Sequence, residues 1–247
     1  MHFANCFFIV ASAVLSNINV GGGLAGPSVD RGGGGILGPG ASVIELSVAL
    51  DVPNRDDPNS ILSVLDRLSR TARTDSRVGV QDLTSRVALE LLRRKSSIVA
   101  AHARGRHHAD PGPAQREYNG VAIRERGKFQ RETVSRYGGV DYNDPSSSSS
   151  SSSPSRRRGI PEDDSAGKAT VAVVTILMLI DGDSTSRAMP SRIGSVRDVE
   201  EALSRIAADA KADDCLRSAE ILWTPEERDE TLTMREVLAD YPSLRSI

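Results

Sequence analysis

The stretch that decides the fold is ATVAVVTILMLI, residues 169–180, which is followed at once by Asp181-Gly182-Asp183-Ser184-Thr185. As an α-helix, residues 169–180 would span about 18 Å, too short for a hydrocarbon core of roughly 30 Å. Their content of Val, Ile and Thr favours an extended strand, and an unbroken apolar run is typical of a strand with both faces buried. We therefore predict that this segment is the central strand of a sheet.

Upstream of this strand, the ordered part of the chain is predicted to begin at Ala41. Residues 42–52 alternate in polarity, with Glu45 and Ser47 on one face and only aliphatic side chains on the other, which indicates a half-buried strand. Apolar residues at helical spacing then predict two amphipathic helices that include residues 61–68 and 83–92, and a third helix at about 114–137.

Downstream, Ser195 with Asp198 marks the start of another helix, and residues 218–223 read as a strand. Thr233 with Glu236 forms the sequence pattern of a capping box, which predicts a short last helix ending before Tyr241. The resulting order β-α-α-α-β-α-β-α predicts an α+β fold, with a small mixed sheet of about three strands covered by helices. We expect this domain to extend over residues 41–247.

The N-terminal segment, residues 1–20, is hydrophobic, and FANCFFIVASAVLSNINV, residues 3–20, contains no charged side chain. As a helix it would reach about 27 Å, which predicts a membrane anchor. The alternative is a cleaved signal peptide with its small-residue site at Ala11-Ser12-Ala13. Residues 21–40 are rich in glycine and are predicted to form a flexible tether.

A Ser- and Arg-rich insertion, residues 144–166, is predicted to interrupt the domain. It contains eight consecutive serines, residues 146–153, and three arginines, residues 156–158, so it has nothing to bury and should be disordered. The chain has a net charge of -2, and its arginines alternate with acidic residues rather than clustering with aromatics, so we expect no nucleic-acid partner. Two cysteines that are far apart, Cys6 and Cys215, argue against a disulfide framework.

Several stretches resemble the fluctuating-light-acclimation family of plastids and cyanobacteria, whose shared region is catalogued as domain of unknown function 1517. The most specific are residues 222–225 (LWTP) and 238–244 (LADYPSL), with further agreement in residues 42–50 and 118–133. The resemblance implies a non-catalytic, membrane-associated regulator of photosynthesis, acting through photoprotection, stromal pH or ion balance. It also implies a single-pass protein of the thylakoid or envelope membrane, with its targeting leader missing and with unknown protein partners. We expect no cofactor.

Three aromatic residues in these matching stretches, Phe129, Trp223 and Tyr241, are the candidate partner surface. Trp223 has an alternative interpretation as an ordinary core aromatic.

The rival function is enzymatic. Asp181-Gly182-Asp183-Ser184-Thr185 resembles the D-x-D-x-T loop of haloacid-dehalogenase-type phosphohydrolases, in which the resemblance implies Asp181 as the nucleophile, Asp183 as the acid/base and a magnesium ion. Only 66 residues follow Asp181, too few for the βα units that would bring further ligands to one rim. We therefore favour a turn at this position.

The histidines of residues 102–112 are candidate metal ligands. His102, His107 and His108 could bind a metal, but adjacent histidines among Arg104 and Arg106 lack the spacing of a known site, so a solvated loop is the favoured interpretation. A secreted soluble domain remains the third alternative for the whole chain.

Overall fold

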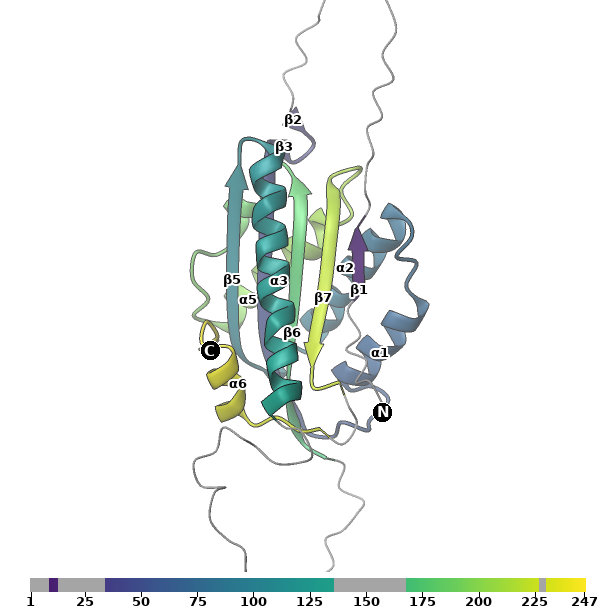
Figure 1. Cartoon of the computed structure of the whole chain (residues 1–247), viewed down its shortest axis with the longest axis vertical. Helices are drawn as coiled ribbons and strands as arrows, with labels where there is room; N and C mark the ends of the chain where they lie inside the picture. Colours follow the sequence, from purple (N-terminus) through teal and green to yellow (C-terminus); the bar gives the residue numbers. More distant parts are fainter. Residues whose placement is uncertain (1–8, 13–33, 136–167, 227–229) are drawn as a thin grey trace, which may run out of the picture.

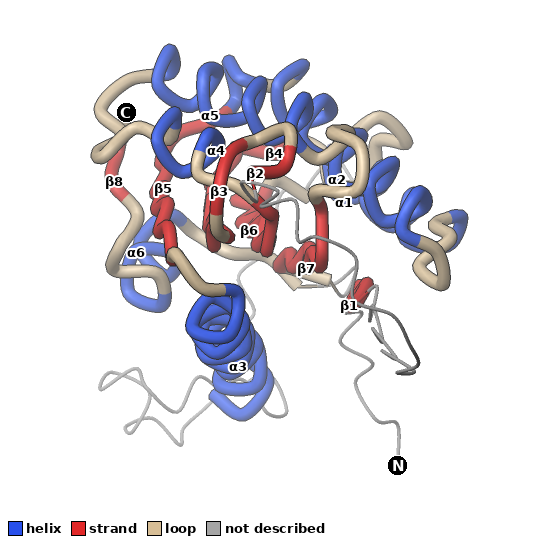
Figure 2. Tube along the Cα trace, turned by 90° about the horizontal axis from the view of Figure 1, so that it is seen from above, coloured by secondary structure: helices blue, strands red, loops and turns tan. Residues whose placement is uncertain are grey.

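The computed structural model describes residues 9–12, 34–135, 168–226 and 230–247 (Figure 1). Most of these residues belong to one sheet with helices on both of its faces, as the view from above shows (Figure 2). The predicted Ser-rich insertion lies outside the described residues, and so does most of the predicted N-terminal anchor.

The sheet has six strands in the order β1-β7-β6-β4-β5-β8, and every neighbouring pair is antiparallel. The strands are β1 (Ile9–Ser12), β4 (Ala41–Val52), β5 (Ile98–His108), β6 (Thr170–Asp181), β7 (Leu216–Thr224) and β8 (Arg245–Ser246). Two further short strands, β2 (Gly34–Gly35) and β3 (Gly38–Pro39), form a separate hairpin. The segment that opened the sequence analysis is strand β6, and it lies between β4 and β7 with residues 170–180 buried. Its prediction as a central strand is confirmed.

The helices divide between the two faces of the sheet (Figures 1 and 2). One face is covered by α1 (Ile61–Thr71), α2 (Arg77–Arg93), α4 (Ser184–Ala188) and α5 (Val196–Asp209). The opposite face carries α3 (Pro111–Ser135) and α6 (Met234–Asp240), and a 3₁₀ turn, η1 (Lys95–Ser97), connects α2 to β5. The α+β class is therefore confirmed, with helices in two layers around one sheet.

The predicted helix starts are present as caps. The Ser195 side chain accepts a hydrogen bond from the backbone N–H of Asp198, and Thr233 and Glu236 form the reciprocal capping box at the start of α6. These side chains satisfy N–H groups that have no partner within the helix, which is why both helices begin where the sequence indicated.

The sheet itself is larger than predicted. Six antiparallel strands replace the small mixed sheet of about three, and residues 98–108, expected to end in a solvated loop, form strand β5. The prediction that β4 is half-buried was also wrong, because residues 41–50 are buried on both faces. The reason is α3, which covers the face that carries Glu45 and Ser47.

The N-terminal predictions need two corrections. Ile9–Ser12, expected within a hydrophobic helix, form strand β1 along the edge of β7. Residues 34–40, expected within a flexible tether, include the β2–β3 hairpin, and the Gly182 N–H donates to the Gly40 carbonyl. Among the described residues, none of the helices has the length and apolarity needed to cross a bilayer.

Candidate functional site

A buried polar layer separates two apolar clusters on the α3 face of the sheet. One apolar cluster is centred on Tyr118, Leu177 and Leu179 near the start of α3, and the other includes Val173 and Tyr241 near α6. Between them, charged and hydroxyl side chains from β4, β5, β6 and β7 meet those of α3. We call this set the polar layer. It consists of Glu45, Ser47, His102, Glu125, Thr175 and Glu220 with the α3 cations Arg124, Arg126 and Lys128.

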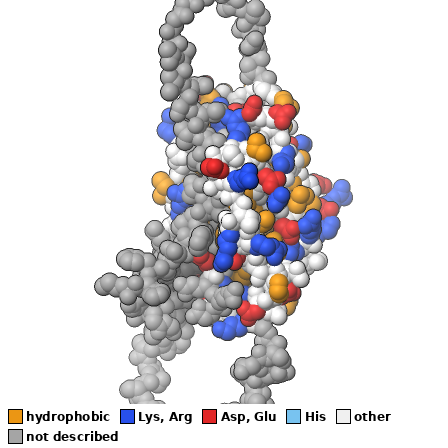
Figure 3. All heavy atoms as spheres, turned by 90° about the vertical axis from the view of Figure 1, so that its right-hand side faces the viewer, with side chains coloured by type: hydrophobic (Ala, Val, Ile, Leu, Met, Phe, Trp, Pro, Cys, Tyr) orange, Lys and Arg blue, Asp and Glu red, His pale blue; other side chains and the backbone are white. Residues whose placement is uncertain are grey.

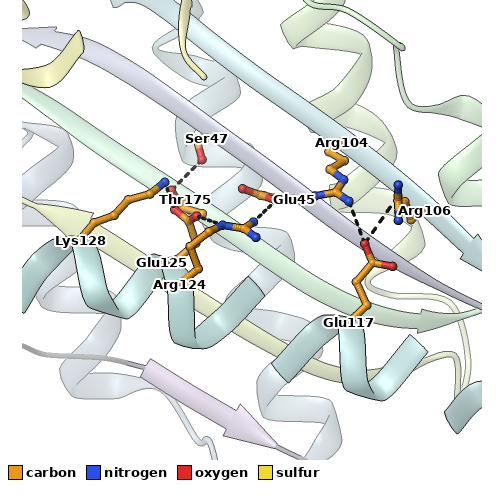
Figure 4. Close-up of polar contacts among 9 residues, drawn as sticks. All are labelled: Glu45, Ser47, Arg104, Arg106, Glu117, Arg124, Glu125, Lys128 and Thr175. Carbon is orange, nitrogen blue, oxygen red and sulfur yellow. Dashed lines mark hydrogen bonds and ion pairs between the residues drawn. The ribbon is translucent and has the colours of Figure 1, made fainter. Parts of the chain in front are cut away.

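Two buried carboxylates lie at the centre of the polar layer (Figure 4). The Glu125 side chain is 1% exposed, and its Oε2 accepts from Lys128 Nζ at 2.6 Å. The Glu45 side chain is 6% exposed and pairs with Arg124 Nη2 at 3.3 Å, while Arg124 Nε lies 3.4 Å from Glu125 Oε1. Arg124 therefore bridges a strand carboxylate to a helix carboxylate, which offsets the cost of burying both.

Burial raises the pKa of the Glu45 carboxyl above its ordinary value, and the nearby Glu125 carboxylate raises that pKa further. The cations Arg124, Lys128 and Arg104 oppose the shift. Because burial dominates, the folded protein favours the protonated form of Glu45 more than an unfolded chain would.

The rest of the polar layer is hydrogen-bonded or lies close to its charges. The hydroxyls of Ser47 and Thr175, opposite each other on β4 and β6, are 2.8 Å apart. Burial, followed by the charge of Lys128, lowers the pKa of His102. The Lys128 ammonium also lies 4.8 Å from the centroid of the Tyr241 ring, which places α6 against the end of the layer.

Glu220 is the buried carboxylate of the polar layer on β7. Glu220 accepts from Arg126 through both of its oxygens, at 3.0 and 2.6 Å, and its side chain is 3% exposed. The Tyr118 hydroxyl donates to Glu220 Oε1 at 3.4 Å, and burial raises the pKa of that phenol. A bidentate arginine fixes the carboxylate geometrically as well as neutralising it.

At the β5 edge, Glu117 of α3 holds three basic side chains. Its Oε1 accepts from Arg104 Nη2 at 3.0 Å and lies 3.7 Å from Arg106 Nε (Figure 4). Its Oε2 is 2.5 Å from His108 Nε2. Along its length, α3 is thus fastened to the sheet by charge pairs at three places. The polar layer is therefore an internal contact between a helix and a sheet, and its chemistry suits the positioning of α3.

Asp181 is the last residue of β6, and Asp183 follows in the bend that leads into α4, so the loop is the turn that the sequence favoured. The backbone N–H groups of Asp183 and Ser184 both donate to the Leu37 carbonyl, at 3.0 and 2.9 Å. Gly182, between Asp181 and Asp183, has a φ of 99°, in the region that favours glycine. The Asp181 carboxylate accepts from Arg217 Nε at 2.6 Å, and Asp183 pairs with Arg187 at 2.7 Å.

This geometry does not support the phosphohydrolase alternative. The backbone N–H groups of Asp183 and Ser184 are occupied by the β2–β3 segment. Strand β6 runs antiparallel to both of its neighbours, so neither neighbour has its carboxyl end on the same side of the sheet as this loop. Within the described ranges, no cluster of three or more His, Cys, Asp or Glu side chains is arranged to hold a metal.

The three histidines lie on β5 and not in a loop. His108 pairs with Glu117, His107 lies 3.5 Å from the Ser42 hydroxyl through Nδ1, and His102 belongs to the polar layer. They are therefore distributed along an eleven-residue strand, each in a different environment.

Two of the three aromatic residues proposed as a partner surface are in the core. Trp223 is 7% exposed and belongs to the large cluster beneath α2 and α5, and Tyr241 is 1% exposed. Both side chains therefore pack in the core and are not exposed to a partner. The side chain of Phe129 lies outside the described residues.

The sequence analysis missed the polar layer. Glu45 and Ser47 were assigned to a solvent-facing side, and Glu220 was not singled out. A signal was present, however: Thr175 and Glu220 are polar residues inside otherwise apolar strands, at the same level as Ser47 and Glu45 once the strands are aligned.

The family model described as "Protein of unknown function (DUF1517)" matches residues 40–247, so the chain belongs to this family. It is 26% identical over 241 residues to Protein FLAP1 homolog A of Synechocystis sp. and 26% identical over 254 residues to the chloroplastic FLUCTUATING-LIGHT-ACCLIMATION protein 1 of Arabidopsis thaliana.

These matches cover 96% and 92% of the chain but only 66% and 60% of the two relatives, so the chain spans less than two thirds of each curated protein. No solved structure matches the chain. The resemblance noted in the sequence is thereby confirmed as family membership.

Proposed function

We propose that the chain is a non-catalytic regulatory protein that acts in acclimation to fluctuating light in a photosynthetic organism. The observation that carries this proposal is the match over residues 40–247 to a family with a cyanobacterial relative and a chloroplast relative, the second of which is named for light acclimation. The polar layer supports it, because its buried carboxylates are engaged by cations of α3. Such pairs position a helix and leave no carboxylate poised as a nucleophile.

The finer proposal is that the protein acts in plastids at the thylakoid or envelope membrane, through photoprotection, stromal pH or ion balance. The chloroplast relative supports the compartment. The raised pKa of the Glu45 carboxyl beside Glu125 gives the fold a group that is sensitive to pH. Membrane association through residues 3–20 stays a prediction, and the pairing of Ile9–Ser12 with β7 is a competing arrangement for the same segment.

Genetic complementation tests the regulatory role. A Synechocystis strain that lacks its FLAP1 homolog A would express this chain, and chlorophyll fluorescence would be followed under alternating strong and weak light. We expect the chain to restore the fluorescence kinetics of the parent strain, and a variant without residues 111–135, which form α3, to fail. Full expression of the intact chain without any restoration would refute the proposal.

Two further measurements test the competing readings. Purified protein is assayed against a general phosphatase substrate with magnesium, together with Asp181→Asn. Turnover that disappears in the variant would establish the enzymatic reading and overturn ours. For the membrane, a carboxyl-tagged chain is fractionated from plastids. Retention in membranes after an alkaline wash is the expected result, and complete release into the soluble fraction or the medium would remove the anchor.

A further inference from the structure

The outer edge of β5 is the longer of the two incompletely paired edges of the sheet, as far as the described residues extend. On its inner side, β5 pairs with β4 from Ile98 to His108. On its outer side, β8 pairs only with Ala100 and Ala101 (Figure 2). At the opposite edge of the sheet, the chain itself supplies β1, which covers Ser218–Ile221 of β7.

The direction of the free backbone groups follows from the β8 contact. The N–H of Ile247 donates to the Val99 carbonyl at 3.2 Å, so this carbonyl points outward, and the neighbouring β8 pair joins Ala101 to Arg245. Because this direction alternates along a strand, Ala101 points the same way toward β8, and Ala103, Gly105 and His107 point outward beyond it. Among the described residues, these three have no strand partner on that side.

The side chains beside this edge are basic. Arg104 and Arg106 lie on the α3 face, and their side chains are 36% and 59% exposed. Arg245 begins β8 at the lower end of the open stretch and is also exposed. Glu117 is the acidic side chain that pairs with these β5 arginines, and it is itself shared with His108. A strand laid along residues 102–108 would therefore run beside a row of positive charge.

We propose that the edge of β5 over residues 102–108 is a docking site for an extended acidic segment of a partner protein, which adds to the sheet as a further strand. The backbone groups of Ala103, Gly105 and His107 would supply the hydrogen bonds, and Arg104 and Arg106 would select acidic side chains. This inference is independent of the proposed function.

A second copy of this chain fits the edge poorly. Two β5 strands paired across a twofold axis would place Arg104 and Arg106 of one copy beside the same residues of the other, and directly opposed like charges destabilise a strand pair. Charged residues on an open edge are also a known protection against edge-to-edge aggregation. The same arginines that repel a copy would attract an acidic strand, and this charge complementarity decides the occupant.

A peptide-binding experiment tests the site with the full chain. The probe is a fluorescein-labelled peptide of alternating Val and Glu, equal in length to residues 102–108, and the comparison probe alternates Val and Lys. Fluorescence anisotropy is measured against wild type, Arg106→Glu and His107→Pro. Arg70→Glu on α1 is the matched charge control, because Arg70 is 72% exposed and its helix lies beyond the β7 side of the sheet (Figure 1). On the face turned to the viewer in Figure 3, Lys and Arg side chains are interspersed with Asp and Glu.

Arg106 is largely exposed, so its reversal should leave the fold intact and weaken binding of the Val–Glu probe at least tenfold, about 1.4 kcal/mol. His107→Pro removes an outward N–H and should abolish saturable binding, with circular dichroism confirming that it folds. Arg70→Glu should bind like wild type.

Four outcomes would overturn the proposal, the first three of them in the binding assay. These are equal binding of the Val–Lys probe, unchanged affinity in Arg106→Glu, and no saturable binding of the Val–Glu probe to wild type. A fourth is a wild-type dimer in solution that His107→Pro dissociates, because it would assign the edge to a second copy.

Discussion

Lys128→Met tests what the buried charge pair beneath α3 contributes to stability, because Lys128 and Glu125 lie three residues apart on that helix, where it packs against the sheet. The change keeps a long side chain against Tyr241 but removes the ammonium that lies 2.6 Å from Glu125 Oε2. Glu125 would then remain buried, and among the described residues only Arg124 Nε, at 3.4 Å, would balance its charge. Breaking a buried pair by removing one partner costs about 3–5 kcal/mol, because it leaves an uncompensated charge in the interior.

Because Arg124 remains, we expect a loss near the lower end, about 3 kcal/mol of the free energy of unfolding. For a domain of this size that corresponds to a fall in Tm of about 6–12 °C. Urea unfolding is followed by circular dichroism and by the fluorescence of Trp223, which is the chain's single tryptophan and is buried in β7.

The double variant Glu125→Leu with Lys128→Met removes both charges and should recover most of the loss, since a buried ion pair can often be replaced by apolar side chains at little cost. Arg70→Ala breaks an exposed pair with Asp66 and should cost at most about 0.5 kcal/mol. If Lys128→Met were no more destabilising than Arg70→Ala, the buried pair of Lys128 and Glu125 would not be contributing to the stability of the fold.

Three further predictions concern single positions. The first is that the stability of wild type relative to Glu45→Gln declines as pH rises through the raised pKa of Glu45, because the folded state binds that proton more tightly than the unfolded chain. Urea unfolding at several pH values measures this difference in stability, and a difference that does not change with pH would contradict the prediction. Gly182→Ala should destabilise the protein by about 1–3 kcal/mol, because the φ of Gly182 is 99° and a Cβ would collide with the Leu37 carbonyl. Gly120→Ala, on the open surface of α3, should stabilise it by about 0.5–1 kcal/mol. Thermal melts of the two variants should therefore shift in opposite directions. Thr233→Ala removes the capping box of α6 and should cost about 1 kcal/mol in the same melts, and an unchanged Tm would argue against the cap.

The elements with strong local signals could be predicted from the sequence. Strand β6 was evident from an unbroken apolar run, and helices α5 and α6 were evident from Ser195 and Thr233 with their capping partners. Helix α3 continues through Gly120 and Gly127, and ion pairs with the sheet lie on both sides of Gly120, at Glu117 with Arg104 and at Arg124 with Glu45. Local propensity was overridden there by tertiary contacts.

The elements that were missed depend on distant partners. Strand β5 reads AHARGRHH in its last eight residues, a polar sequence that becomes a strand because every residue from 100 to 108 is paired with β4. The polar face of β4 looked solvated because nothing in residues 41–52 reveals that α3 covers it. Strand β1 lies inside an apolar segment that, taken alone, suits a membrane helix at least as well.

The facing hydroxyls of Ser47 and Thr175 also give the two longest strands a unique alignment. Strands β4 and β6 are paired over twelve positions and are apolar along most of their length, so sliding one past the other by two residues would keep aliphatic side chains on the same faces. Such a slide would separate the two hydroxyls and carry Glu45 away from Arg124. The polar layer thus penalises misaligned versions of the sheet that hydrophobicity alone would tolerate, and a chain with Ser47, Thr175 and Glu45 all replaced by aliphatic residues should fold to several alignments.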